Sequence, residues 1–349
     1  MADRALLPAI LEALPLPTLA IDRNERIIAL NAKAQSLVGA GALARHFVTI
    51  LRQPALVEAV ERSLGDGKPR HAPFLAGDVS KPLTYDVSLS TVETTGTLIV
   101  SFQDITHEAE AGQMRRDFVA NVSHELRTPL TSLMGFIETL GGPARNDAAA
   151  RDRFLQIMSD EAGRMNRLIG DLLSLSRVEA EARVKPTAKV DLTDILGTTL
   201  RNLTPLAQER DVSLVAAFSS DPLPLMGDAD QLVQVFTNLV ENAIKYGAAH
   251  QPVEISAETS LRDPALRGPA VRITVTDHGP GIAPMHLPRL TERFYRADSH
   301  RSRKLGGTGL GLAIVKHILN RHRGRLKITS EIGQGSAFTV ILPLDVPAA

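Results

Sequence analysis

The feature that most constrains the fold is an apolar pattern repeated every seven residues in segment 149–180. One row holds Met158, Met165 and Leu172, and the interleaved row holds Leu168 and Leu175, with Glu161 interrupting it. Two such rows form the a and d positions of a helical packing seam. Segment 110–140 also predicts a long helix, and the glycines and proline of "GGPARND" end it. The chain is therefore expected to contain a hairpin of two long helices.

A single hairpin can bury such a seam only by packing against something else. Two hairpins from two copies of the chain form a four-helix bundle, which is the most economical solution. We therefore expect a homodimer.

The first helix contains "NVSHELRTPL", in which His124 precedes Glu125 and a proline follows at 129. Proline in a helix interior removes a backbone donor and clashes with the carbonyl four residues earlier, here that of Glu125. A weakened turn beside His124 suggests a hinge. A neutral imidazole is a competent nucleophile near pH 7, and a neighbouring carboxylate can orient it and hold a proton.

Mixed α/β regions flank the hairpin. Before it, short strands are expected in "TLAIDRNERIIALN", "LTYDVSLSTVE" and "GTLIVSFQDIT", and helices in "AKAQSLVG" and "LVEAVERSLGDG". After it, strands are expected in "VSLVAAFS", "PVEISAET", "AVRITVTD", "RLKITS" and "AFTVILPL". Helices are expected there over Thr193–Glu209, Asp230–Tyr246 and Leu310–His322. These patterns predict an α+β multidomain chain with domains at 1–106, 107–182 and 183–349.

The amino-acid composition excludes several classes of protein. Lysine plus arginine and aspartate plus glutamate number 39 each, so nucleic acid is not expected as a partner. Cysteine is absent, which excludes disulfides and cysteine-based metal sites. No run of about 18 apolar residues predicts a membrane span, and no secretory signal pattern occurs. We expect a cytoplasmic location; membrane helices preceding Met1 in a longer parent protein stay an open alternative.

Two segments predict parts of a nucleotide site. In "NLVENAIKYG", Asn238 and Asn242 share a helix face with Tyr246, and Lys245 offers a positive charge. Asparagine oxygens suit Mg²⁺, and asparagine amides suit phosphate. In "VTDHGPGI", Asp277 ends a strand before Gly279 and Gly281, where it could accept a hydrogen bond from an exocyclic amine such as that of adenine. A polar helix face and a glycine turn are the simpler alternatives.

Two further segments complete the set. In "KLGGTGLGLAIVKHI", four glycines at 306, 307, 309 and 311 accompany a helix start at Leu310, where backbone N–H groups favour phosphate. The spacing fits neither a Rossmann fingerprint nor a P-loop. The preceding "ERFYRADSHRSRK" is a basic segment typical of a lid over phosphates or of a solvated charge run; its cations are Arg293, Arg296, Arg301, Arg303 and Lys304.

The ordered set of segments resembles the GHKL ATP-binding fold, with N, G1, F and G2 boxes in "NLVENAIKY", "DHGPGI", "ERFYR" and "GTGLGLAIV". "NVSHELRTPL" is similar to the H box of sensor histidine kinases of two-component systems. The resemblance covers residues 107–345, and the layout looks like that of phosphate-regulon-type kinases. Region 1–106 resembles a PAS sensor domain through "LPLPTLAIDRNERIIALNAKAQSLVG" and "FQDIT".

The resemblance implies a role for each matching residue. His124 accepts phosphate from Mg-ATP and passes it to an aspartate of a response regulator, and Glu125 is its acid/base partner. Glu125 and Thr128 match a phosphatase motif, so Thr128 would position water against the regulator's phosphoaspartate. Asn242 is the implied magnesium ligand. The implied nucleotide contacts are Asn238, Asn242, Lys245, Tyr246, Asp277, Gly279, Gly281, Arg296, Gly307, Gly309, Leu310 and Gly311.

Two alternatives stay open at this level. A GHKL ATPase without phosphotransfer resembles the same fold but carries a glutamate where Asn238 stands, and asparagine cannot activate water as that base does. A catalytically weak, PAS-containing scaffold would have the same layout, although the intact boxes argue against it.

Overall fold

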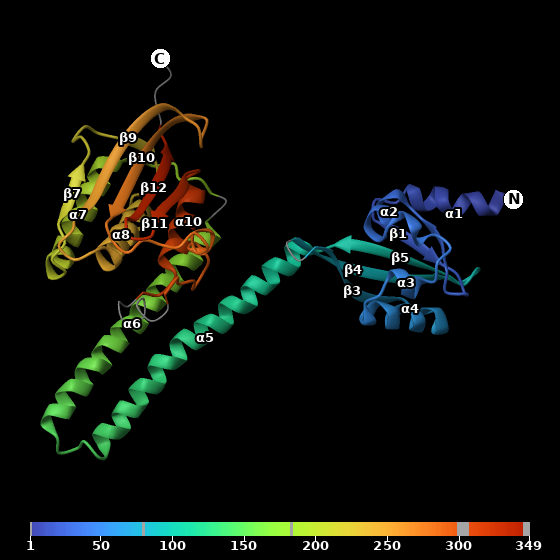
Figure 1. Cartoon of the computed structure of the whole chain (residues 1–349), viewed down its shortest axis with the longest axis horizontal. Coiled ribbons are helices and arrows are strands. Elements are labelled where there is room, and N and C mark those ends of the chain that lie inside the picture. The colour runs from blue at the N-terminus through green and yellow to red at the C-terminus, as the bar shows by residue number, and fades with distance from the viewer. Residues whose placement is uncertain (1, 79–80, 182–183, 299–306, 345–349) are drawn as a thin grey trace. The chain divides into compact units, whose positions relative to one another are not determined.

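The computed structural model describes residues 2–78, 81–181, 184–298 and 307–344 (Figure 1). The chain divides into two compact units, residues 1–120 and 121–349. Each unit has its own sheet and its own buried core. The finer division into three domains stays a prediction.

The first unit is built on a five-stranded antiparallel sheet in the order β2-β1-β5-β4-β3. Its strands are β1 Thr18–Ile21, β2 Ile27–Leu30, β3 Arg70–Asp78, β4 Lys81–Val92 and β5 Thr97–Asp104. The helices between β2 and β3 are α2 Ala32–Val38, η1 Ala40–Ala42, α3 Phe47–Ile50 and α4 Pro54–Asp66. Leu19 and Ile21 of β1 bury one sheet face under α3 and α4, while Ala20 faces Leu11 of α1 (Ala2–Glu12).

The sequence predicted most of this unit, and β1, β2, β4, β5, α2 and α4 are confirmed. It missed β3. In the first half of this strand the buried residues are Ala72 and Phe74, and Pro73 between them is a residue that strands usually exclude. It also missed α1, which contains Pro8, a residue that normally ends or kinks a helix.

The predicted helical hairpin is confirmed as α5, Thr106–Gly141, and α6, Ala148–Ala180. Asp147 caps α6 by accepting a hydrogen bond from the backbone N–H of Ala150 at 3.0 Å. Phe136 and Phe154 stack between the helices with ring centroids 5.2 Å apart. Pro129 is buried within α5, and its role as a hinge stays a prediction.

The rest of the second unit is a sheet with helices on one face (Figure 1). Strand order is β11-β12-β10-β9-β7, antiparallel except for the parallel pair β7–β9. The strands are β7 Leu214–Ala217, β9 Val253–Asp263, β10 Gly268–Asp277, β11 Arg325–Glu331 and β12 Gly335–Pro343. The helices are α7 Leu192–Glu209, α8 Ala229–Tyr246 and α10 Gly311–Arg321, with a short turn of 3₁₀ helix, η2, at Leu287–Arg289.

Burial alternates along β10: Val271, Ile273 and Val275 are fully buried, while the residues between them are half-buried. Successive side chains of a strand point to opposite faces of the sheet, so this alternation fits a sheet with helices on one face. All five strands and three helices predicted for this region are confirmed, the helices to within one residue at each end. The two-stranded sheet of β6 (Lys189–Asp191) and β8 (Pro224–Met226) was missed, since three residues are too few for a pattern. None of the helices in the described ranges combines the length and apolarity needed to cross a bilayer.

Candidate active site

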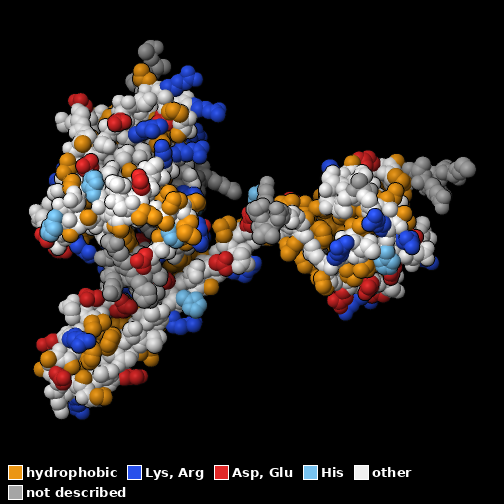
Figure 2. Space-filling model, viewed as in Figure 1, with side chains coloured by type: hydrophobic (Ala, Val, Ile, Leu, Met, Phe, Trp, Pro, Cys, Tyr) orange, Lys and Arg blue, Asp and Glu red, His pale blue; other side chains and the backbone are white. Residues whose placement is uncertain are grey.

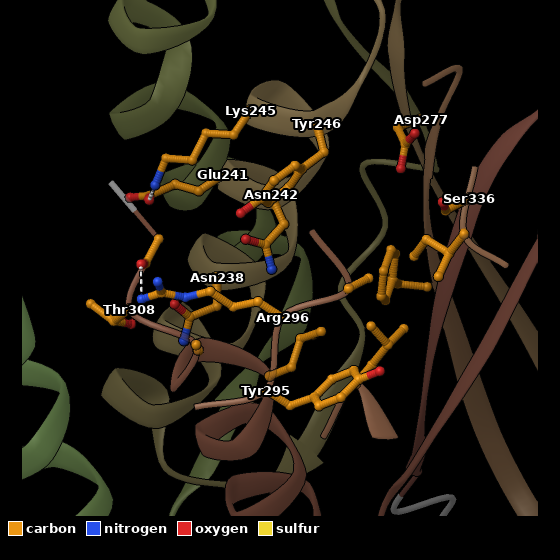
Figure 3. Close-up of a pocket in the computed structure, with 18 of the residues that line it drawn as sticks. Asn238, Glu241, Asn242, Lys245, Tyr246, Asp277, Tyr295, Arg296, Thr308 and Ser336 are labelled. Carbon is orange, nitrogen blue, oxygen red and sulfur yellow. Dashed lines mark hydrogen bonds and ion pairs between the residues drawn. The ribbon is translucent and has the colours of Figure 1, made fainter. Parts of the chain in front are cut away.

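Helix α8 forms the floor of a cavity of about 670 Å³. Its apolar face is buried through residues such as Leu232, Phe236 and Leu239, so its opposite face presents polar side chains to the cavity. Asn238, Asn242 and Lys245 come from successive turns of that face (Figure 3). The i, i+4 spacing thus places the two asparagines as predicted.

Most of the predicted nucleotide contacts meet at this cavity. It is lined by Asn238, Asn242, Lys245, Tyr246, Asp277, Gly281, Arg296, Gly307, Gly309 and Gly311. Two predicted residues, Gly279 and Leu310, are not part of the lining. The backbone N–H of Gly279 donates to Asp277 Oδ1 at 2.9 Å, and Leu310 is buried directly before α10. Arg301, Arg303 and Lys304 of the predicted lid lie outside the described residues.

Asp277 marks one end of the cavity, at the carboxyl end of β10 (Figure 3). Its side chain is buried, and burial raises the pKa of its carboxyl, opposed by hydrogen bonds from the backbone N–H groups of Gly279 and Ser336. The two backbone donors fix the carboxylate in place. A fixed, buried acceptor is suited to selecting a ligand that carries an amine.

Two glycines allow backbone segments to approach this cavity closely. Gly281 has φ +72°, and a Cβ there would lie 2.0 Å from the carbonyl oxygen of Glu331. Gly309 has φ +74°, and a Cβ there would lie 2.9 Å from Phe294, whose N–H donates to Gly309 O at 2.8 Å. Both positions combine a left-handed backbone with tight contact, which only glycine accommodates.

The other end of the cavity gathers positive and amide groups (Figure 3). Lys245 pairs with Glu241, and Arg296 donates to the carbonyl of Gly307. Within the described residues, Asn238 Nδ2 and Arg296 Nε are buried without a hydrogen-bond partner. Buried donors that lack partners are costly, so this end is suited to an anionic ligand that would satisfy them.

The start of α10 adds to this anion-binding end. Gly307 and Gly309 precede the helix, and Gly311 begins it beside Asn238 Oδ1. Free backbone N–H groups and the helix dipole favour negative charge at such a start.

The H-box residues lie on α5 and do not line the cavity. His124 is exposed, and Thr128 donates to its carbonyl oxygen at 3.1 Å. Glu125 links the helix to the cavity instead, because its carboxylate pairs with Arg164 at 2.9 Å and with Arg296 at 3.3 Å. The structure therefore brings Glu125 into contact with Arg296, a cavity residue, while His124 is exposed and is not part of the cavity lining.

Several lining residues were not predicted. Glu241 lies one turn beyond Asn238 on α8, and Thr308 lies between two predicted glycines. Both residues could therefore have been predicted from the motifs that contain them. Tyr295 is held by a 2.6 Å hydrogen bond with His286 Nδ1 and by Arg289 4.2 Å above its ring. Arg167, Gly170 and Asp171 line the cavity from α6. No local sequence pattern predicts that a helix distant in the sequence contributes to the cavity lining.

A sheet covered by helices, with an asparagine-bearing helix, a strand-end aspartate and a glycine-rich helix start around one cavity, defines a GHKL-type nucleotide-binding fold. Residues 227–346 match the family of histidine kinase-, DNA gyrase B- and HSP90-like ATPases. Residues 114–181 match the His Kinase A phospho-acceptor domain, which favours the kinase prediction over a GHKL ATPase without phosphotransfer.

Similar proteins agree with these matches. The chain is 34% identical over 345 residues to the sensor-like histidine kinase SenX3 of Mycobacterium tuberculosis, covering 98% of this chain and 81% of SenX3. It is 43% identical over 239 residues to the phosphate regulon sensor protein PhoR of Pseudomonas aeruginosa, covering 68% of this chain and 52% of PhoR. The chain belongs to the sensor histidine kinase family.

These relatives are longer than this chain. It covers 53% of the sensor protein kinase WalK of Staphylococcus saprophyticus at 34% identity over 94% of its own length. It thus spans about half the length of PhoR and of this WalK. The fold is shared with a crystal structure of histidine kinase ThkA in complex with response regulator protein TrrA. The TM-score is 0.53 and the identity 19%, and the match covers 96% of this chain and 98% of the matched chain.

Proposed function

We propose that this protein transfers the γ-phosphoryl group of ATP to His124 and then to an aspartate of a response regulator. The observation that carries the proposal is the cavity itself, where residues of all four predicted boxes converge and Arg296 reaches Glu125 of the H box. The family membership supports the same activity.

In the proposed complex, adenine lies at the Asp277 end and the triphosphate at the end formed by Asn238, Lys245 and the start of α10. Asp277 accepts from the adenine amine, and buried donors of Asn238 and Arg296 gain phosphate partners. Lys245 is then drawn from Glu241 toward phosphate oxygens, since a phosphate carries more charge than one carboxylate.

Magnesium fits the donor set at the triphosphate end. Asn242, with Asn238 and the Glu241 carboxylate nearby, offers the hard oxygen ligands that Mg²⁺ prefers alongside phosphates. Asn242 would hold the ion, and the ion would neutralise charge on the transferring phosphoryl group. Asn238 and Glu241 would support it.

His124 acts as the nucleophile. A ring nitrogen forms a bond to the γ-phosphorus as the bond to the β–γ bridging oxygen breaks and ADP leaves. Glu125 holds the proton on the other ring nitrogen and stabilises the positive charge that develops on the ring. Because Glu125 is now paired with Arg164 and Arg296, and His124 is outside the cavity, the reaction needs a rearrangement that frees Glu125 and brings His124 to the phosphate.

The active form of the protein is proposed to be a homodimer joined through α5 and α6. Apolar side chains are exposed on this hairpin, as Figure 2 shows for one face. Along the whole hairpin, on whichever face they lie, the large apolar side chains that are at least 44% exposed are Met114, Val119, Leu130, Met134, Ile137, Leu155, Ile169 and Leu173. A second hairpin would cover them in a four-helix bundle.

The first unit is proposed to be a PAS-like sensor. Its sheet order β2-β1-β5-β4-β3, with α2, η1, α3 and α4 inserted between β2 and β3, supports this assignment.

Incubation with γ-labelled ATP tests the kinase proposal. Wild type is expected to acquire acid-labile, base-stable label, and Asn242→Ala is expected to lose most of it because magnesium and triphosphate are no longer held. Steady ATP turnover without phosphoprotein would instead indicate an ATPase, and failure to bind Mg-ATP would indicate a scaffold.

A phosphatase activity is proposed beside the kinase, with Thr128 positioning water against the regulator's phosphoaspartate. Thr128→Ala should slow loss of label from the phosphorylated receiver domain and leave autophosphorylation intact. Equal loss of both activities would contradict this role.

A further inference from the structure

The ring of Tyr295 forms part of the cavity lining, together with apolar side chains such as Ile282 and Leu290. Tyr295 directly precedes Arg296, which lies at the end proposed for the triphosphate. In Figure 3 the ring lies on the opposite side of the cavity from Tyr246 of α8. Flat aromatic rings are suited to contact with a base or a sugar, so Tyr295 fits the nucleoside part of a nucleotide.

The backbone on both sides of Tyr295 is tied to the glycine-rich segment that precedes α10. The N–H of Phe294 donates to the carbonyl of Gly309 at 2.8 Å, and the Arg296 guanidinium donates to the carbonyl of Gly307. Phe294 also has a left-handed backbone, φ +64°, which fixes the direction in which the chain enters Tyr295. The freedom that remains to Tyr295 is therefore rotation of its side chain.

Two side chains of segment 286–290 restrict this rotation. His286 Nδ1 lies 2.6 Å from the hydroxyl oxygen of Tyr295, which is a short hydrogen bond. The Arg289 guanidinium lies over one face of the ring, 4.2 Å from its centroid, and pairs with Glu292 at 3.2 Å. Within the described residues, neither His286 nor Arg289 belongs to the cavity lining. We therefore expect both to act on a bound ligand through Tyr295.

We propose that His286 is a positioning residue for nucleotide binding: it holds the Tyr295 ring in the orientation that forms an aromatic wall for the nucleoside. The inference rests on the proposed function, because the nucleoside is that of Mg-ATP. An unrestrained tyrosine side chain has three staggered positions of its first torsion angle. If one of them fits a bound nucleotide, the apparent affinity falls by the fraction of protein in that position, a loss of up to about threefold.

A double-mutant cycle tests this inference, measured by calorimetric titration of the full chain with Mg²⁺ and the β,γ-imido analogue of ATP. His286→Ala and Tyr295→Phe each remove one partner of the hydrogen bond, and each should weaken binding by about two- to threefold. The double variant should bind no more weakly than either single variant, because both changes remove the same interaction. His286→Asn places an amide near the position of Nδ1 and should restore most of the affinity.

Two substitutions in the first unit are matched controls. His71→Ala removes a histidine whose Nδ1 also pairs with a side chain, that of Asp86 at 2.9 Å. Tyr85→Phe removes the hydroxyl of another buried tyrosine. Both controls should bind the analogue as wild type does. Titration with Mg²⁺ and ADP should show the same factor of loss for His286→Ala as the analogue does, since ADP carries the same nucleoside.

Each outcome decides the inference. Unchanged binding by His286→Ala, or additive losses in the double variant, would overturn it, because His286 would then not act through Tyr295. A loss with the analogue and none with ADP would place the ring at the γ-phosphate and overturn the contact with the nucleoside. These results leave wild-type binding, and with it the proposed function, intact. Absence of binding in every protein, with native circular dichroism, would overturn the proposed function and the inference with it.

Discussion

At the scale of single residues, the cavity depends on backbone approaches that side chains would block. Asp277 is held by two backbone N–H groups, and Gly281, four residues later, lets the loop lie against Glu331. The strand end and the β11–β12 connection are therefore packed together around the carboxylate. A fixed Asp277 follows from this packing.

Gly281→Ala tests the close approach. Gly333→Ala is the control, since Gly333 also has a left-handed backbone, φ +84°, but a Cβ there meets nothing within 4 Å. Both variants should lose about 1–2 kcal/mol from the backbone effect, and Gly281→Ala should lose about 1–3 kcal/mol more from the collision. Urea denaturation followed by circular dichroism gives both values; equal losses would show that the contact with Glu331 is unimportant.

The sequence predicted residues of this site where the chemistry lies within one element. Asn238 and Asn242 were found from i, i+4 spacing, and Asp277 from a strand end followed by glycines, and all three line the cavity. Asp171 could not be found this way, because its contact with Thr308 joins residues 137 positions apart. Residues supplied by another helix become visible only when the packing is known.

At the scale of elements, His322 joins the end of α10 to the start of α8. Its Nε2 accepts from the backbone N–H of Asp228, the residue that caps α8, and its Nδ1 donates to Ile318 O at 2.8 Å. This bonding requires the neutral imidazole. Burial lowers the pKa of His322, with Arg321 lowering it further and the Ile318 carbonyl and Asp228 opposing.

This arrangement predicts a pH dependence of stability. Since the folded-state pKa of His322 lies below its ordinary value of 6.5, its contribution is complete above pH 6.5 and is lost as pH falls through the folded-state pKa. The slope reaches at most about 1.4 kcal/mol per pH unit for one proton. His322→Gln should be less stable at pH 7.5 and should lose less of its unfolding free energy between pH 6.5 and 5 than wild type.

Urea denaturation at several pH values provides the measurement, with His107→Gln as control because its side chain is almost fully exposed. The difference between wild type and variant removes the parallel contribution of His317, whose pKa burial also lowers. Parallel curves for wild type and His322→Gln would contradict the account.

Elements were predicted in proportion to the length of their patterns. The helices α5 and α6 were found because apolar periodicity persists over many turns, whereas β6 and β8 are too short to show alternation. Their pairing depends on Val190 and Leu225 meeting across 35 residues of chain, which no local pattern encodes.

At the scale of the whole molecule, the exposed apolar side chains on α5 and α6 predict association of two copies. Ile137 is 57% exposed on α5, and a charge there would be buried unpaired in a bundle. Ile137→Glu should shift the mass measured by light scattering toward the monomer. Leu261→Glu, on β9 and 83% exposed, should leave the mass unchanged. A monomeric wild type, or a dimer that tolerates Ile137→Glu, would count against the bundle.

Transfer of phosphate from ATP to His124 can be tested by a single labelling measurement. Wild type and His124→Ala are incubated with Mg²⁺ and γ-labelled ATP, and the acid-labile label on each protein is counted. The exposed His124 side chain leaves room for the substitution without loss of packing, so the variant should fold and still bind nucleotide. We expect label on wild type and none above background on His124→Ala; acid-labile label on the variant would show that His124 is not the phosphoacceptor.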